Sequence, residues 1–92
     1  MVDSLEQLRR SAPALARLDP LSTEVRAWLD RAYDAVKRVD AAEGVIFAMH
    51  ERYLLDPAGK IVAAEEIVAT VQRAARTVAL MRKMGVAQRP AA

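Results

Sequence analysis

The longest stretch of the chain without a helix-breaking residue places the strongest constraint on its fold. Residues 21–55 contain no proline and a single glycine, Gly44. Within them, one set of positions recurs at alternating gaps of four and three residues, which keeps side chains on one face of a helix, as in a coiled coil. These positions are Val25, Leu29, Ala32, Val36, Val39, Glu43, Ile46, His50 and Tyr53. We therefore expect one long helix over 21–55, with Glu43 and His50 as polar interruptions of an apolar stripe.

A second long helix is expected over 58–84. It follows the Leu-Asp-Pro tripeptide at 55–57, and aspartate before proline favours the start of a helix. Its apolar positions are Ala64, Ile67, Val71, Ala74, Val78 and Met81. Gly85 follows as a C-terminal cap, because glycine adopts the left-handed conformation that ends many helices. A short turn between two long helices makes them antiparallel.

The two ends of the chain carry weaker patterns. An apolar stripe over 3–18 predicts a short helix, which Pro13 kinks because its ring removes a backbone hydrogen bond and clashes one turn back. Residues 85–92 are expected to form a frayed tail.

Composition favours one small all-α domain over residues 1–92. The chain is 53% hydrophobic but only 4% aromatic, and it contains no cysteine. A chain of this length has a marginal core that disulfides, a metal or a partner subunit usually supplement. Since disulfides are excluded, we expect the helical hairpin to pair with a second copy into a dimeric four-helix bundle, because two-fold dimers are the commonest oligomers.

The run from Gly44 to Met49 is apolar on every side of the predicted helix. A helix that is apolar all round is covered on more than one face. We expect the contact with a second copy, or with another helical protein, at Val45, Ile46, Phe47 and Met49. Burial of the same surface by the N-terminal helix is the alternative.

Glu43 and His50 acquire facing partners once the two long helices are aligned about the turn near Pro57. Glu43 then lies opposite Gln72, and His50 lies opposite Glu65. Buried polar pairs are satisfied in only one register, so these pairs are interpreted as features that fix the helix alignment. The alternative is a metal site at Glu43, His50 and Glu65, although the Glu-x-x-His ligand motif of di-iron bundles is absent.

Positive charge collects toward the C-terminus. From Ile67 onward there are five bases and no acid, although the net charge of the chain is only +2. Arg73, Arg76, Arg82 and Lys83 are candidates for an anion-binding surface that would take nucleic acid. The same bases could instead be favoured by the dipole at a helix C-terminus, by pairing with Asp34 or Asp40, or by apolar surface that their long aliphatic stems cover.

No pattern predicts catalysis or a bound cofactor. His50 is the only histidine, the three glycines are isolated, and no serine stands near a histidine in sequence. No apolar run is long enough to span a membrane, and the N-terminus lacks the order of a signal peptide, so a cytoplasmic protein is expected. The alanine- and arginine-rich composition is typical of bacteria with GC-rich genomes. These observations together favour a non-catalytic protein–protein interaction, adaptor or regulatory module.

Overall fold

The computed structural model describes residues 3–85, and the side chains from Leu5 onward. Within that range the chain forms four helices and no strand, so the all-α prediction is confirmed. The helices are α1 (Asp3–Arg10), α2 (Thr23–Val39), α3 (Ala41–Tyr53) and α4 (Lys60–Lys83).

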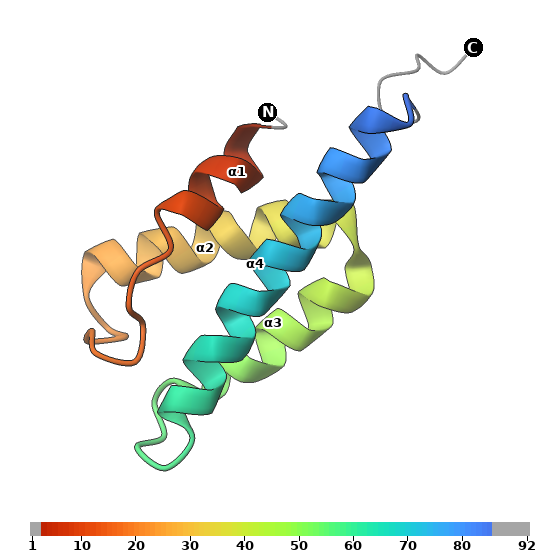
Figure 1. Ribbon diagram of the computed structural model, residues 1–92. Coiled ribbons are helices and arrows are strands. Elements are labelled where there is room, and N and C mark those ends of the chain that lie inside the picture. The colour runs from red at the N-terminus through yellow and green to blue at the C-terminus, as the bar shows by residue number, and fades with distance from the viewer. Residues whose placement is uncertain (1–2, 86–92) are drawn as a thin grey trace.

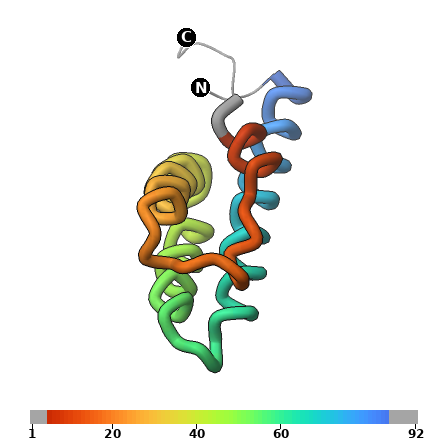
Figure 2. Tube along the Cα trace, turned by 90° about the vertical axis from the view of Figure 1, so that its left-hand side faces the viewer, coloured from red at the N-terminus to blue at the C-terminus, as the bar shows by residue number. Residues whose placement is uncertain are grey.

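The helices pack in two layers around one core. Figure 2 shows α1 and α4 on one side of the molecule and α2 and α3 on the other. Helices α3 and α4 run antiparallel on either side of a short turn, and α2 crosses behind α4 (Figure 1). Helix α1 contacts α2 and α4 but does not contact α3. The N-terminal helix is therefore stacked on the side of the molecule away from α3.

The prediction of one helix over 21–55 is wrong, because the chain turns sharply at Asp40. Asp40 has an extended backbone (φ −151°, ψ 109°) and is both the last cap of α2 and the first cap of α3. Its backbone N–H donates to the carbonyl of Val36 at 2.9 Å. Its carboxylate accepts from the backbone N–H groups of Ala42 and Glu43 at 2.9 and 3.4 Å. Helix ends leave such groups unpaired, and a side-chain oxygen satisfies them at low cost.

Gly44 permits the two helices to approach closely at this turn. A Cβ atom built on Gly44 would lie 3.1 Å from the Cα atom of Lys37 in α2. A Cβ atom at this position would require α2 and α3 to move apart by a few tenths of an ångström. The single glycine of residues 21–55 thus lies where α3 passes close beside α2.

The turn at Asp40 also rotates the core-facing side of the chain by one residue. The expected stripe is correct in α2, where Val25, Leu29, Ala32 and Val36 are buried. In α3 the inward positions are Gly44, Phe47 and Leu54, just after its end, rather than Glu43, Ile46 and Tyr53. Glu43 and His50 therefore do not lie at the centre of the buried face of α3, because the helical periodicity starts again after Asp40.

The segment before α2 differs from the predicted helix over 3–18. Helix α1 ends at Arg10, three residues before Pro13, and turns carry the chain from Ser11 to Ser22. Proline prevents the helix from continuing. Ser22 caps α2 by accepting from the backbone N–H of Val25 at 3.3 Å. The ammonium of Lys60 donates to the carbonyl of Leu18 at 2.7 Å, which joins this segment to the start of α4.

The turn between α3 and α4 matches its sequence signature. The backbone N–H of Gly59 donates to the carbonyl of Asp56 at 3.0 Å, closing a four-residue turn with proline in its second place. Helix α4 ends as predicted, since Gly85 takes a positive φ of 74° after the last helical turn. The tail predicted over 85–92 lies, beyond Gly85, outside the described residues.

The core is built mainly from alanine, valine and leucine, with α4 as its central element. Ala64, Ile67, Val71 and Ala74 are buried, which confirms the expected α4 stripe over its first half. The remaining core side chains are Leu5, Leu8, Leu15, Val25, Trp28, Leu29, Ala32, Val36, Phe47, Leu54, Ala63 and Ala75. Thr70 is the buried polar residue of this group, and its hydroxyl donates to the carbonyl of Ile67 at 2.7 Å. The small side chains of α4 let the other three helices approach it closely.

We expect Asp40→Ala to lower the free energy of unfolding by about 1 kcal/mol, because two backbone N–H groups at the start of α3 lose their acceptor. Asp40→Asn retains a side-chain oxygen and should lose much less. Urea unfolding followed by far-UV circular dichroism measures both variants. Equal losses in the two variants would contradict the capping role.

Candidate functional site

The face of α3 that points away from the core is almost entirely apolar. We define the outer face of α3 as its six exposed residues, which lie opposite Phe47 around the helix: Ala41, Ala42, Val45, Met49, Arg52 and Tyr53. Val45, Met49 and Tyr53 are 67%, 49% and 51% exposed and follow one another at intervals of four residues. Surface helices usually carry polar residues on this side. Arg52 is the single charged residue of this face.

No helix of the described chain covers the outer face. Helix α1, the alternative cover, contacts α2 and α4 instead. The four predicted contact residues differ in their exposure. Val45 and Met49 are exposed, and Ile46 is half-buried. Phe47 is fully buried against the core, with its ring centroid 5.8 Å from that of Tyr33, so it does not belong to an exposed surface.

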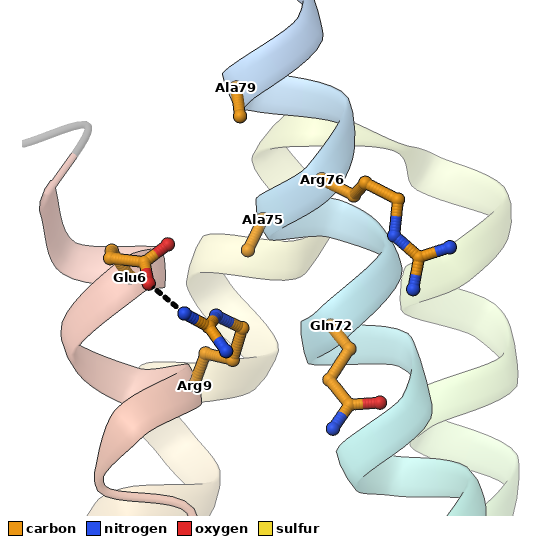
Figure 3. Close-up of a pocket in the computed structure, with 6 residues that line it drawn as sticks. All are labelled: Glu6, Arg9, Gln72, Ala75, Arg76 and Ala79. Atoms are coloured by element: carbon orange, nitrogen blue, oxygen red, sulfur yellow. Dashed lines mark hydrogen bonds and ion pairs between the residues drawn. The ribbon is translucent and has the colours of Figure 1, made fainter.

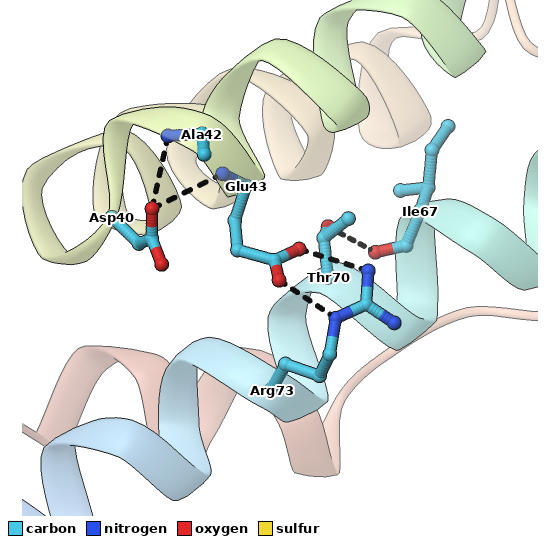
Figure 4. Close-up of polar contacts among 6 residues, drawn as sticks. All are labelled: Asp40, Ala42, Glu43, Ile67, Thr70 and Arg73. Carbon is cyan, nitrogen blue, oxygen red and sulfur yellow. Dashed lines mark hydrogen bonds and ion pairs between the residues drawn. The ribbon is translucent and has the colours of Figure 1, made fainter.

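Glu43 is paired with α4 as expected, but with a different residue. Its two carboxylate oxygens accept from Nε and an Nη of Arg73, each at 2.8 Å (Figure 4). The predicted partner, Gln72, is exposed and is one residue away in the chain. The hydrogen bonds to Glu43 raise the pKa of the Arg73 guanidinium above its usual value, and burial lowers it by a smaller amount. A bidentate pair of this kind fixes the alignment of α3 on α4.

His50 does not form the predicted pair with Glu65. Its Nδ1 atom lies 2.9 Å from the carbonyl oxygen of Ile46, one turn earlier in the same helix. Among the described side chains, no hydrogen bond or ion pair links His50 to Glu65, which is exposed. The metal candidates Glu43, His50 and Glu65 are not brought together, and residues 5–85 contain no group of three or more potential ligands.

Of the four anion-binding candidates, Arg73 is engaged in an ion pair. The charge of Arg73 is compensated by Glu43. Arg76, Arg82 and Lys83 are exposed on the second half of α4. The acids expected to pair with them act elsewhere: Asp34 binds Arg38 within α2 at 3.0 Å, and Asp40 caps α3.

A groove of about 420 Å³ lies between α1 and α4. It is lined by Glu6 and Arg9 of α1 and by Gln72, Ala75, Arg76 and Ala79 of α4. Glu6 and Arg9 form an ion pair along one wall, and the hydrogen bond from Arg9 lowers the pKa of Glu6. Figure 3 shows the Arg76 side chain directed away from Arg9, so the two guanidinium groups do not converge on one ligand position.

A smaller crevice of about 80 Å³ opens between the start of α2 and the end of α3. Leu29, Leu54 and Leu55 contribute apolar walls, and Asp30 and Glu51 lie among the residues that line it. Burial raises the pKa of Glu51, the nearby Asp30 carboxylate raises it further, and Arg26 opposes both. The crevice is only large enough for a single side chain or a few water molecules.

Comparison with protein-family models, with curated proteins and with solved structures found no match to this chain. Across the described residues, no helix has the length and apolar character needed to cross a membrane.

Only part of the outer face of α3 can be predicted from the sequence. The apolar run from Gly44 to Met49 correctly indicates that α3 carries an apolar surface. However, a continuous helix over 21–55 shifts the predicted buried positions of α3 by one residue, so that Tyr53 is predicted to be buried. The missed signal is the pattern Asp40-Ala-Ala-Glu43, since a capping residue followed three positions later by glutamate indicates a helix start.

We expect the Glu43–Arg73 pair to contribute a coupling free energy of about 1 kcal/mol, between the values for exposed and buried ion pairs. The Glu43 side chain is 18% exposed and that of Arg73 is 41% exposed, so solvent screens the pair in part. A double-mutant cycle of Glu43→Ala and Arg73→Ala, measured by urea unfolding, gives this value. The exposed Arg38–Asp34 pair is the control and should give about 0.5 kcal/mol or less. Equal coupling in the two pairs would contradict a fixed alignment by Glu43.

We expect Glu51→Gln to raise the melting temperature at neutral pH. Because the pKa of Glu51 is raised in the folded protein, the folded state binds the proton more tightly than the unfolded state. Stability therefore falls as pH rises from the usual value of 4.5 through the raised value, and the ionised group destabilises the fold above it. Wild type and variant should converge well below pH 4.5. Glu65→Gln, at an exposed position on α4, is the control for the removal of one carboxylate charge. A lower melting temperature for Glu51→Gln at neutral pH would contradict this assignment.

Proposed function

We propose that this protein is a non-catalytic interaction module that binds a helix of a protein partner on the outer face of α3. The observation that carries the proposal is the exposed row Val45, Met49 and Tyr53 on the side of α3 opposite its core contacts. Exposed apolar rows on surface helices mark contact sites more often than isolated exposed residues do.

The location of α1 supports this proposal. The sequence offers the N-terminal helix as the alternative cover for the apolar side of α3, but this helix lies against α2 and α4. Full burial of a side chain of this size stabilises by about 1.5–3 kcal/mol, so three half-exposed side chains leave roughly 3 kcal/mol to be gained by a partner. Helix-in-groove and helix-on-helix contacts use anchors at this four-residue spacing.

Nucleic-acid binding by the basic part of α4 has less support. Arg73 is already compensated by Glu43, and Arg76 does not converge with Arg9 across the groove. A surface that displaces counterions from phosphates needs several uncompensated bases together.

We expect Val45→Asp to abolish complex formation in extracts of the native host. A carboxylate buried without a partner in an interface costs about 2–5 kcal/mol, enough to disperse a complex of moderate affinity. Size-exclusion chromatography of the extract should show wild type well above the chain mass of 10.1 kDa and the variant at that mass.

The matched control is Ile61→Asp, which places the same charge on an equally exposed apolar residue in the first turn of α4. It should elute with the wild type. Circular dichroism should show that both variants retain the wild-type helix content. Elution of wild type as a monomer, or loss of the complex in both variants alike, would overturn the proposed function.

A further inference from the structure

We infer that α1 is a lid on Trp28, which moves away from α2 and α4 while those two helices and α3 stay packed together. Trp28 is the only tryptophan of the chain, and it is 5% exposed when α1 is in place. Opening uncovers the apolar surface of α2 and α4 that α1 buries. The movement is separate from the proposed contact on the outer face of α3, because α1 and α3 make no contact within residues 3–85.

Trp28 lies on the side of α2 that is turned away from α3. Leu29 lines a crevice shared with α3, and the ring centroid of Tyr33 lies 5.8 Å from that of Phe47 in α3. At about 100° per residue around a helix, Trp28 is displaced by about 100° from Leu29 and by about 140° from Tyr33. The indole is therefore directed toward the layer that α1 and α4 form (Figure 2), and α1 contacts α2 as well as α4.

The indole N–H group of Trp28 gains from the opening. Its Nε1 atom is buried, and it has no hydrogen-bond acceptor in the described part of the chain. A buried donor without an acceptor costs free energy relative to the same donor in water. Movement of α1 exposes this N–H group to solvent, so the cost of separating the apolar surfaces is offset in part.

Helix α1 is held by few contacts. It has only eight residues, and isolated helices of this length are marginal in water. Its charged side chains pair within the helix, since the Glu6 carboxylate binds Arg9 one turn later. A groove of about 420 Å³ lies between α1 and the stretch of α4 over 72–79, so the two helices are not in full contact there (Figure 3). The buried side chains of Leu5 and Leu8 are the anchors that α1 supplies.

The hinge of this lid lies at residues 11–14. Helix α1 ends at Arg10, and the four residues that follow are not helical. Leu15 is buried in the core, and the ammonium of Lys60 donates to the carbonyl of Leu18, so the connecting segment is anchored from Leu15 onward. Opening therefore needs rotation only about the backbone of residues 11–14.

Helices α2, α3 and α4 are held together by contacts that do not involve α1. Asp40 caps both α2 and α3, Glu43 binds Arg73 across α3 and α4, and the ring of Phe47 packs beside that of Tyr33. These contacts remain when α1 moves away. The opening therefore exposes much less surface than complete unfolding does.

Hydrogen exchange of the Trp28 indole N–H, followed by NMR in the full chain, tests the lid, because one tryptophan gives one indole resonance. The reference is the backbone N–H of Val71, which is fully buried in α4. After correction for intrinsic exchange rates, the indole should be protected at least about 10-fold less than Val71. Its exchange should also depend less on low concentrations of urea, since a local opening exposes less surface.

Two leucine truncations provide a matched pair of variants. Leu8→Ala removes an anchor of α1 and should lower the protection of the indole by at least about 10-fold. Leu54→Ala removes a similarly buried side chain between α2 and α3, so it should lower the protection of Val71 and leave that of the indole unchanged. Circular dichroism checks that both variants are folded, and the wild-type comparison decides alone if one is not.

Equal protection of the indole and of Val71 in the wild type, with the same urea dependence, would overturn the inference, because Trp28 would then be uncovered only by complete unfolding. Loss of indole protection in Leu54→Ala but not in Leu8→Ala would also overturn it, since the opening would then lie between α2 and α3. Neither result affects the proposed contact on the outer face of α3.

Discussion

The cap formed by Asp40 is the interaction on which the rest of the structure depends. By accepting from the backbone N–H groups of Ala42 and Glu43 and donating to the carbonyl of Val36, this residue ends one helix and starts the next without a connecting loop. A continuous helix over 21–55 would be about 50 Å long and would keep the α2 and α3 segments in line, without the contacts that they make with each other. The break lets α2 and α3 share one layer opposite α1 and α4 (Figure 2).

The same break decides which side of α3 is exposed. Rotation by one residue moves Phe47 into the core, brings Glu43 to the edge where Arg73 binds it, and leaves Val45, Met49 and Tyr53 outside. The Glu43–Arg73 contact and the exposed outer face of α3 therefore both result from the same rotation of α3 about its axis. Glu43–Arg73 holds α3 against α4 on one edge, and Gly44 lets it lie close against α2 on another, so the outer face is carried on a rigidly placed helix.

The sequence predicts the helical class, the end of α4 at Gly85 and most of the buried face of α4, because each depends on local periodicity or on one residue with a strong preference. Prediction fails at Asp40 because a stretch free of proline need not be one helix, and Asp40 and Glu43 together form a start signal. The pairing of Glu43 is predicted one residue away from Arg73. Counting residues from the α3–α4 turn predicts which stretches of the two helices lie opposite each other. It does not predict which of two neighbouring side chains contacts Glu43, because that depends on how each helix is rotated about its axis. The position of α1 is open in the sequence, because its apolar stripe would pack equally well on any uncovered helix.

The path of the chain has a consequence for the order in which its parts fold. Helices α2, α3 and α4 each contact the next along the sequence, so these contacts form after closing only short loops. Helix α1 instead packs against α4 across most of the chain length, through a helix of only eight residues and a connecting segment without helix. It also contacts α2, but its contacts with α4 can form only when α4 is in place, and α1 should be the first element to open under mild denaturant. Amide exchange in α1 would then be faster than in α4, and the core leucines Leu5 and Leu8 would be exposed before the α3–α4 pair separates.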